Sequence, residues 1–133
     1  MEKVPKKFAL VKWKELPWTS MRRGADSKSI IGERATLQLN RLQPGSALRI
    51  HSHPFEQFTY ILSGRMEFHI EEDIVSVAAE SCMLIAPNVT HYGVVQDGKE
   101  LIALDVFVPR KEDNSLYTEL TLEEFEKRYK TKK

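Results

Sequence analysis

The stretch His51-Ser52-His53-Pro54-Phe55-Glu56-Gln57 decides both the fold and the candidate site of this chain. Residues two apart on a β-strand project to the same face, so His51 and His53 can aim their imidazoles at one point. Pro54 turns the chain away, and Gln57 opens a second predicted strand that can return an amide to the same point. A histidine-x-histidine pair is also ordinary on an exposed strand, so the interpretation depends on the surrounding residues.

A third imidazole comes from a distant segment of the chain. The sequence Ile85-Ala86-Pro87-Asn88-Val89-Thr90-His91 puts a predicted turn immediately before His91, which opens another predicted strand. Neutral imidazoles suit Zn, Ni, Fe, Mn or Cu, and an amide oxygen can complete such a site. We therefore predict one divalent transition metal ion, of undetermined identity, bound by four side chains: His51, His53, Gln57 and His91.

These residues stand in a longer pattern that resembles the cupin superfamily. The first cupin motif is Gly, five residues, His-x-His, three or four residues, Glu, six residues, Gly, and it is matched by Gly45, His51, His53, Gln57 and Gly64. The second motif is matched in part, with His91 in register and Asn88 at a glycine position whose left-handed backbone Asn tolerates. The resemblance spans residues 45–109. It implies an all-β fold, a double-stranded β-helix or jelly-roll barrel, with an N-terminal strand arm and a short C-terminal helix.

Gln57 departs from the usual cupin motif, because it occupies the glutamate position while Glu56 comes one residue too early. A glutamine ligand is neutral, so the site holds one negative charge fewer. The pectin-degradation cupins, which act in the ring-opening of unsaturated uronates, share the pattern His-Ser-His-Pro-x-Glu-Gln. Their last barrel strand, Asp-Val-Phe-x-Pro-x-Arg-Glu-Asp, resembles the segment 105–113 here. The resemblance implies that Asp105 and Phe107 line the site, with Lys111 at the arginine position and Arg110 displaced by one residue.

Two charged residues suggest chemistry on their own account. Asp105 lies in the nearly all-apolar segment 101–108, where a buried carboxylate needs a compensating charge and can exchange a proton near neutral pH. Arg49 lies two residues before His51 and points the same way if the strand is regular. An arginine there suits a substrate carboxylate, although a structural salt bridge with a barrel carboxylate, from Asp105 for example, is an equal alternative.

We therefore predict a metal-dependent lyase or isomerase that moves a proton on a small oxygenated acid, such as an unsaturated or keto-deoxy uronate. Asp105 is the predicted proton-transfer residue, and Arg49 or Lys111 is expected to hold a carboxylate. Phe107 and Arg110 are the predicted pocket residues. Two alternatives remain open at this point: an Fe(II)-dependent dioxygenase, and a cupin that binds a small molecule without chemistry.

The 133 residues, 41% of them hydrophobic, predict a single domain. We expect an arm with the first strands over 1–34, the barrel core over 35–110 and a C-terminal extension with a helix over 111–133. The net charge of +1 gives no reason to expect nucleic acid as a partner. The chain has no apolar run near the length of a membrane span and no signal peptide, and its one cysteine, Cys82, suits a reducing compartment; we expect a cytoplasmic protein.

Several smaller expectations concern single segments. Residues 8–11 are a predicted strand, and the arm that contains Trp13 and Trp18 is expected to pack over the barrel or a partner in a homodimer. Residues 21–28 are predicted to form a loop. Gln38 and Asn40 can either line a pocket or face water, and we favour water. We expect His69 to face water and Cys82 to lie in the core. Thr121 and Glu124 form a capping box that begins a helix, whose apolar stripe is Leu122, Phe125 and Tyr129.

Overall fold

Two antiparallel β-sheets enclose the interior of the protein in a computed structural model that describes residues 7–130. Residues 1–6 and 131–133, the ends of the predicted arm and of the C-terminal extension, lie outside this range. The strands are β1 (Thr19–Arg22), β2 (Ala25–Ile31), β3 (Thr36–Leu42), β4 (Ile50–Ser52), β5 (Glu56–Ser63), β6 (Arg65–Ile70), β7 (Asp73–Ala78), β8 (Cys82–Ile85), β9 (His91–Val95), β10 (Leu101–Val108) and β11 (Thr118–Leu120).

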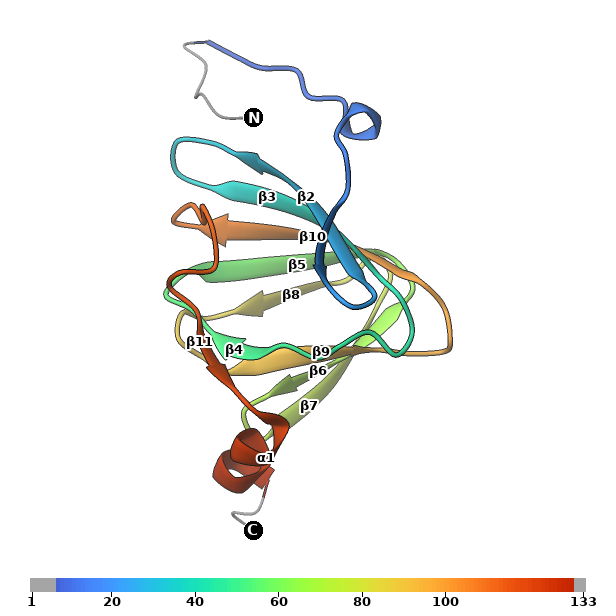
Figure 1. Cartoon of the computed structure of the whole chain (residues 1–133), viewed down its shortest axis with the longest axis vertical. Helices are drawn as coiled ribbons and strands as arrows, with labels where there is room; N and C mark the ends of the chain where they lie inside the picture. The colour runs from blue at the N-terminus through green and yellow to red at the C-terminus, as the bar shows by residue number, and fades with distance from the viewer. Residues whose placement is uncertain (1–6, 131–133) are drawn as a thin grey trace.

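The six-stranded sheet has the order β1-β2-β3-β10-β5-β8, and the five-stranded sheet has the order β11-β4-β9-β6-β7. Figure 1 shows the two sheets facing each other, with the chain passing repeatedly from one to the other. Every strand pair is antiparallel. The predicted all-β jelly-roll barrel is thus confirmed.

The interior changes character along the length of the strands. Inward positions of β3 run Thr36, Gln38, Asn40 and Leu42, while those of the antiparallel β10 run Leu101, Ala103, Asp105 and Phe107. On β5 the inward positions are Gln57, Thr59 and Ile61. One end of the barrel is therefore an apolar core, in which Ile61 and Leu101 are fully buried. The other end gathers polar side chains, and this division of the interior creates the site.

Two of the motif positions have the backbone conformation that their residue types favour. Gly64 has φ +93°, and a Cβ there would lie 2.9 Å from the carbonyl oxygen of Glu100. Asn88, at the glycine position of the second motif, has φ +66°. Its amide N–H donates to the carbonyl of His53 over 2.8 Å, which ties the turn before β9 to the segment after β4.

The C-terminal segment covers the outside of the five-stranded sheet. A capping box joins Thr121 and Glu124 at the start of α1 (Leu122–Phe125), which continues into the π-helix η2 (Glu126–Lys130). Phe125 is completely buried against Ile50 and Tyr92. The expectation that this helix packs on the barrel is confirmed, although Leu122 of the predicted stripe is 40% exposed. Within the described residues, no helix has the length and apolar composition required to cross a bilayer.

The N-terminal part differs from the prediction at two places. Residues 8–11 form no strand, and Phe8 and Leu10 are 81% and 80% exposed. Residues 21–28, predicted as a loop, belong to the hairpin of β1 and β2, which turns at Gly24 with φ +76°. The polar composition was misleading, because β2 pairs with β3 along its whole length and the polar residue Lys28 is buried there. A short 3-10 helix, η1 (Trp13–Glu15), precedes the hairpin.

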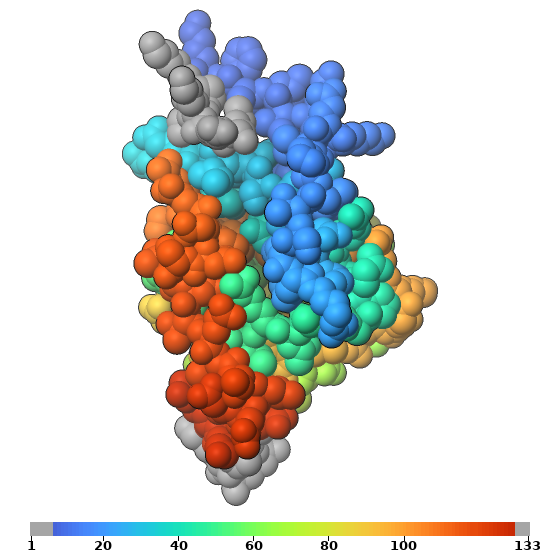
Figure 2. All heavy atoms as spheres, in the orientation of Figure 1, coloured from blue at the N-terminus to red at the C-terminus, as the bar shows by residue number. Residues whose placement is uncertain are grey.

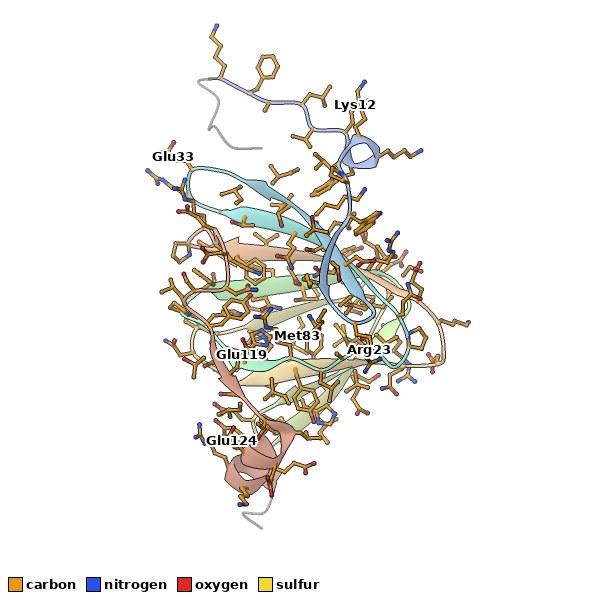
Figure 3. All side chains as sticks on the ribbon, viewed as in Figure 1. Lys12, Arg23, Glu33, Met83, Glu119 and Glu124 are labelled. Atoms are coloured by element: carbon orange, nitrogen blue, oxygen red, sulfur yellow. The ribbon has the colours of Figure 1, made fainter. Side chains whose placement is uncertain are left out.

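Two single-residue expectations were also wrong. His69 is buried rather than exposed, because it stacks on its cross-strand neighbour Tyr92, with 4.5 Å between ring centroids. Cys82 is exposed rather than buried, since it lies on the outer face of the edge strand β8, whose inward positions are Met83 and Ile85. Figure 3 shows Met83 among the side chains between the two sheets.

Candidate metal centre

Three imidazoles from two segments meet inside the polar end of the barrel. His51 on β4 and His91 on β9 are cross-strand partners, and their ring centroids are 4.5 Å apart. His53 follows β4, and its centroid lies 5.3 Å from that of each of the other two rings. One ligand nitrogen from each histidine lies within 4.8 Å of the others. This geometry is compatible with three bonds to a single ion.

Hydrogen bonds to the backbone orient all three rings in the same way. The Nδ1 atoms of His51, His53 and His91 lie 2.7, 3.1 and 2.8 Å from the carbonyl oxygens of Arg49, Phe55 and Val89. A carbonyl can only accept, so each Nδ1 carries the proton and each Nε2 presents its lone pair. Protein ligands to metal ions commonly have this arrangement.

Burial keeps the imidazoles neutral. It lowers the pKa of His51 to about 2, with the neighbouring His91 adding to the effect, and lowers the pKa of His91 to about 4. Burial also lowers the pKa of His53. The Nε2 atom of His91 is buried and has no hydrogen-bond partner in the described structure. A neutral nitrogen ligand aimed into a shared space fits a divalent transition metal.

Gln57 contributes the oxygen beside these nitrogens. Its Oε1 atom lies 3.0 Å from Nε2 of His53, so two acceptors face each other, and a cation between them would satisfy both. The Gln57 amide nitrogen donates to the hydroxyl of Thr59 over 2.8 Å, which orients the oxygen toward the histidines. Glu56 is the preceding residue of β5 and belongs to its other face. The donor set in the cavity is therefore three imidazole nitrogens and one amide oxygen.

A chain of hydrogen bonds leads from Gln57 to the predicted proton-transfer residue. Thr59 donates to Oδ1 of Asp105 over 2.6 Å, and Asn40 donates to Oδ2 over 2.7 Å. Gln38 then donates to Asn40 over 2.8 Å. Burial raises the pKa of Asp105, while the hydrogen bonds from Thr59 and Asn40 oppose that rise. The expectation that Gln38 and Asn40 face water was wrong, because the polar face of β3 is its inner face.

Lys111 ends this chain of hydrogen bonds. Its ammonium group donates to Oε1 of Gln38 over 3.0 Å and lies 4.7 Å from the centre of the Phe107 ring. The hydroxyl of Thr36 anchors the Lys111 backbone, with 2.8 Å to its amide nitrogen and to its carbonyl oxygen. Burial lowers the pKa of Lys111 to about 8, although Asp105 acts in the opposite direction. Lys111 thus remains a cation at neutral pH.

Arg49 lines the cavity and also forms a structural ion pair, which was the alternative to carboxylate binding in the prediction. It precedes β4 and lines the cavity, while its guanidinium forms an ion pair with Glu119 over 3.2 Å. Its Nε atom is buried without a partner in the described structure. The guanidinium carbon lies 4.9 Å from the centre of the Tyr117 ring, which itself stacks on His51 at 4.8 Å. Figure 3 shows Glu119 on β11.

Of the two predicted pocket residues, only one lines the cavity. Phe107 is 2% exposed and meets His53 edge to face at 5.7 Å. Arg110 points elsewhere, pairing with Glu112 over 3.1 Å and donating to the carbonyl of Gly32. The chain turns after β10, so Lys111 takes the inward position. Other residues also line the cavity without having been expected there from the sequence, among them Arg22, Gln38, Asn40, Thr59 and Tyr117. The spacing of Thr59 from Gln57 was the one available signal.

The cavity in front of these groups has a volume of about 90 Å³. Its walls come from the β1–β2 hairpin, the segment around β4 and the segment after β10, which contribute Arg22, Arg49 and Tyr117. Figure 2 shows these segments meeting on one face of the molecule, in blue, green and orange. The volume admits the reacting end of a small molecule, because drug-sized ligands need several times as much space.

A barrel of two antiparallel sheets with an imidazole cluster at one inner end defines a jelly-roll protein with a candidate metal site. The family model described as Cupin domain matches residues 38–107, and the chain belongs to that family. A search of curated proteins finds no match.

Solved structures of similar fold include KdgF from Halomonas sp., with TM-score 0.73, 17% identity and coverage of 80% of this chain and 98% of that one. The polyketide cyclase RemF from Streptomyces resistomycificus has TM-score 0.71, 17% identity and coverage of 90% and 91%. Oxalate decarboxylase from Bacillus subtilis, with Mn(II) centres, has TM-score 0.67 and 17% identity; the match covers 81% of this chain and 30% of that one. At these identities the likeness shows the fold alone.

Proposed function

We propose that this protein is a metal-dependent lyase or isomerase that moves a proton on a small oxygenated acid. The observation that carries the proposal is the buried carboxylate of Asp105, held by Thr59 and Asn40 next to the candidate metal ligands. A carboxylate used only for packing would be costly in this position. A carboxylate whose pKa is raised by burial is suited to proton transfer near neutral pH.

His51, His53, Gln57 and His91 would hold the metal, which would act as a Lewis acid on neighbouring substrate oxygens. Lys111 and Arg49 supply positive charge for the carboxylate of the substrate. Asp105 accepts a proton from the substrate and returns it at another atom, while Thr59 and Asn40 keep its two oxygens in place. Phe107 and Tyr117 provide apolar walls that reduce access of water to the reacting atoms.

The sequence resemblance to the pectin-degradation cupins makes unsaturated or keto-deoxy uronates the substrate class to test first. In ring-opening of an unsaturated uronate, a base removes the proton of the anomeric hydroxyl group. The ring C–O bond then breaks, a carbonyl forms, and the enolate so released takes up a proton on carbon to become a ketone. The reaction is redox-neutral and requires no co-reactant, which suits a site with a single proton-transfer carboxylate.

The test is a comparison of the metal-loaded wild type with Asp105→Asn on a panel of such uronates, following the C=C absorbance and the keto product by NMR. Asp105→Asn should lower turnover by about 10²- to 10⁴-fold without lowering substrate affinity to a similar degree. Asp97→Asn is the matched control, because Asp97 pairs with Arg65 on the surface. Wild-type-like turnover by Asp105→Asn would contradict the assigned role.

The same preparations separate the alternatives. Oxygen consumption by iron-loaded protein would indicate a dioxygenase. Binding of an acid without turnover by any metal-loaded form would indicate a protein that binds without catalysis. We assign the activity to the cytoplasm, since the exposed thiol of Cys82 suits a reducing compartment.

We also propose that the protein is a homodimer. The outer face of the six-stranded sheet carries a row of neighbouring apolar residues, Leu37, Val106, Phe58 and Leu84. Tyr60 and Leu62 continue it and are 39% and 47% exposed. Strand spacing and length give this face roughly 600 Å², against the roughly 800 Å² that each partner of a standard interface buries. The exposed arm residues Phe8 and Leu10 would extend the contact.

A further inference from the structure

Arg22 brings a third positive charge to the cavity. It lies at the end of β1, lines the cavity, and its Nε atom donates to the carbonyl of Ala47 over 2.7 Å. That carbonyl belongs to the segment leading to Arg49, so the two guanidinium groups are held on neighbouring segments. Burial lowers the pKa of Arg22, and the charge of Arg49 lowers it further. Two like charges are therefore kept close together in a partly buried place.

The protein balances these charges in part, through Glu119, which pairs with Arg49 and also raises the pKa of Arg22. Asp105 is the sole carboxylate among the lining residues that the structure describes, and its oxygens are taken by Thr59 and Asn40. Within residues 7–130, no carboxylate forms an ion pair with Arg22 or Lys111. A divalent cation bound by the histidines would increase the excess of positive charge in the cavity. Uncompensated positive charges in a partly buried cavity favour an anionic ligand.

The three cations occupy two depths. Lys111 is 9% exposed and bonded to Gln38 in the interior, whereas the Arg49 side chain is 17% exposed and pairs outward with Glu119. Tyr117 lies between them, with its ring centre 5.0 Å from the Lys111 ammonium and 4.9 Å from the Arg49 guanidinium carbon. A single carboxylate on the deep lysine would leave the two arginines with Glu119 alone as an ion-pair partner within residues 7–130.

We propose that Arg22 and Arg49 form a second anion subsite, and that the substrate carries two carboxylates, one on Lys111 and one on this arginine pair. The Nε hydrogen bond to Ala47 holds the Arg22 head in place, while its terminal nitrogens remain available for a planar carboxylate. The inference names the substrate class within the function proposed above. The simplest members of this class are dicarboxylic acids with a short carbon chain between the two carboxylates.

The test measures binding rather than turnover. Calorimetric titrations of zinc-loaded protein compare glutarate with valerate, which have the same carbon count but two carboxylates and one. Wild type should bind glutarate about tenfold more tightly or better, and Arg22→Met should bring the ratio close to one. Arg23→Met is the matched control, because the neighbouring Arg23 also bonds a loop carbonyl, that of Gly45, but is exposed. The ratio of glutarate affinity to valerate affinity should be the same for Arg23→Met as for wild type.

Repeating the titrations after removal of the metal distinguishes carboxylate binding by the arginines from carboxylate binding by zinc. The preference for glutarate should persist without zinc. Equal binding of glutarate and valerate by wild type overturns the inference, as does an unchanged ratio in folded Arg22→Met. If Arg22→Met does not fold, Arg22→Lys replaces it. The point charge of a lysine cannot bind both the Ala47 carbonyl and a bidentate carboxylate, so the preference of this variant for glutarate over valerate should fall several-fold. A preference for glutarate over valerate without turnover of any uronate would refute only the proposed reaction. Turnover of a uronate without that preference would refute only the anion subsite.

Discussion

Lys111 is a buried cation whose protonation should affect the stability of the whole protein. Its pKa is lowered from 10.5 to about 8, so between these values the unfolded chain binds a proton that the native state does not. Stability therefore rises with pH in this window, and the cost of the buried charge is fully present below pH 8. From about pH 7.5 to about pH 9.5, the free energy of unfolding should increase by about 2 kcal/mol from this residue.

Urea unfolding of the metal-free protein at several pH values measures this increase. Lys111→Met keeps the side-chain length without the charge, so its stability should lose that rise. Burial raises the pKa of Tyr117, which reduces stability only above its ordinary value of 10.0, so the comparison stays below that pH. Parallel curves for wild type and Lys111→Met would show that Lys111 titrates normally.

Residues with a strong local pattern were predictable, and those defined by partners distant in sequence were not. His51 and His53 share a strand face, and Gln57 lies at the motif position, so the sequence alone placed them. Tyr117 stacks on His51 across a long separation in sequence, with no motif around it. Arg22 lay in a segment whose polar composition predicted a loop, although it lines the cavity.

At the scale of elements, hydrophobic alternation identified the strands but not which face is the inner one. On β3 the leucines Leu37 and Leu39 face outward, while Gln38 and Asn40 are 7% and 6% exposed inside. The usual assumption that apolar residues point inward fails here because Asn40 donates to the carboxylate of Asp105. The C-terminal helix was predictable, since its capping box is a local signal.

That helix should also support the metal centre through one residue. Phe125 is fully buried against Ile50 and Tyr92, which adjoin His51 and His91 in the β4–β9 pair. Phe125→Ala should therefore lower the free energy of unfolding by about 3–5 kcal/mol, and weaken metal binding as the strand pair loosens.

Urea unfolding and metal titration of Phe125→Ala measure both effects, with Leu122→Ala as the control. Leu122 belongs to the same helix but is 40% exposed, so its loss should cost about 1 kcal/mol or less and leave metal affinity unchanged. If Phe125→Ala binds metal as tightly as wild type, the helix stabilises the fold without positioning the ligands.

At the scale of the whole molecule, the apolar core and the candidate site lie at opposite ends of the barrel. Residues such as Ile61 and Leu101 fill one end with an apolar core, and the buried polar groups of β3, β5 and β10 lie at the other. The candidate site is thereby mounted on strands whose far ends are tightly packed. This allows a rigid arrangement of ligands in a small barrel.

The outer face of the six-stranded sheet leads to a prediction about assembly. Leu84 on β8 is 55% exposed within the apolar row of this face, and Ile74 on β7 is equally exposed on the other sheet. Light scattering coupled to size exclusion should give wild type twice the chain mass of 15.4 kDa. Leu84→Lys should shift the protein to monomer, because a charge placed within an apolar interface loses its hydration. Ile74→Lys should remain dimeric; a monomeric wild type, or a dimeric Leu84→Lys, would show that this face is not where two copies meet.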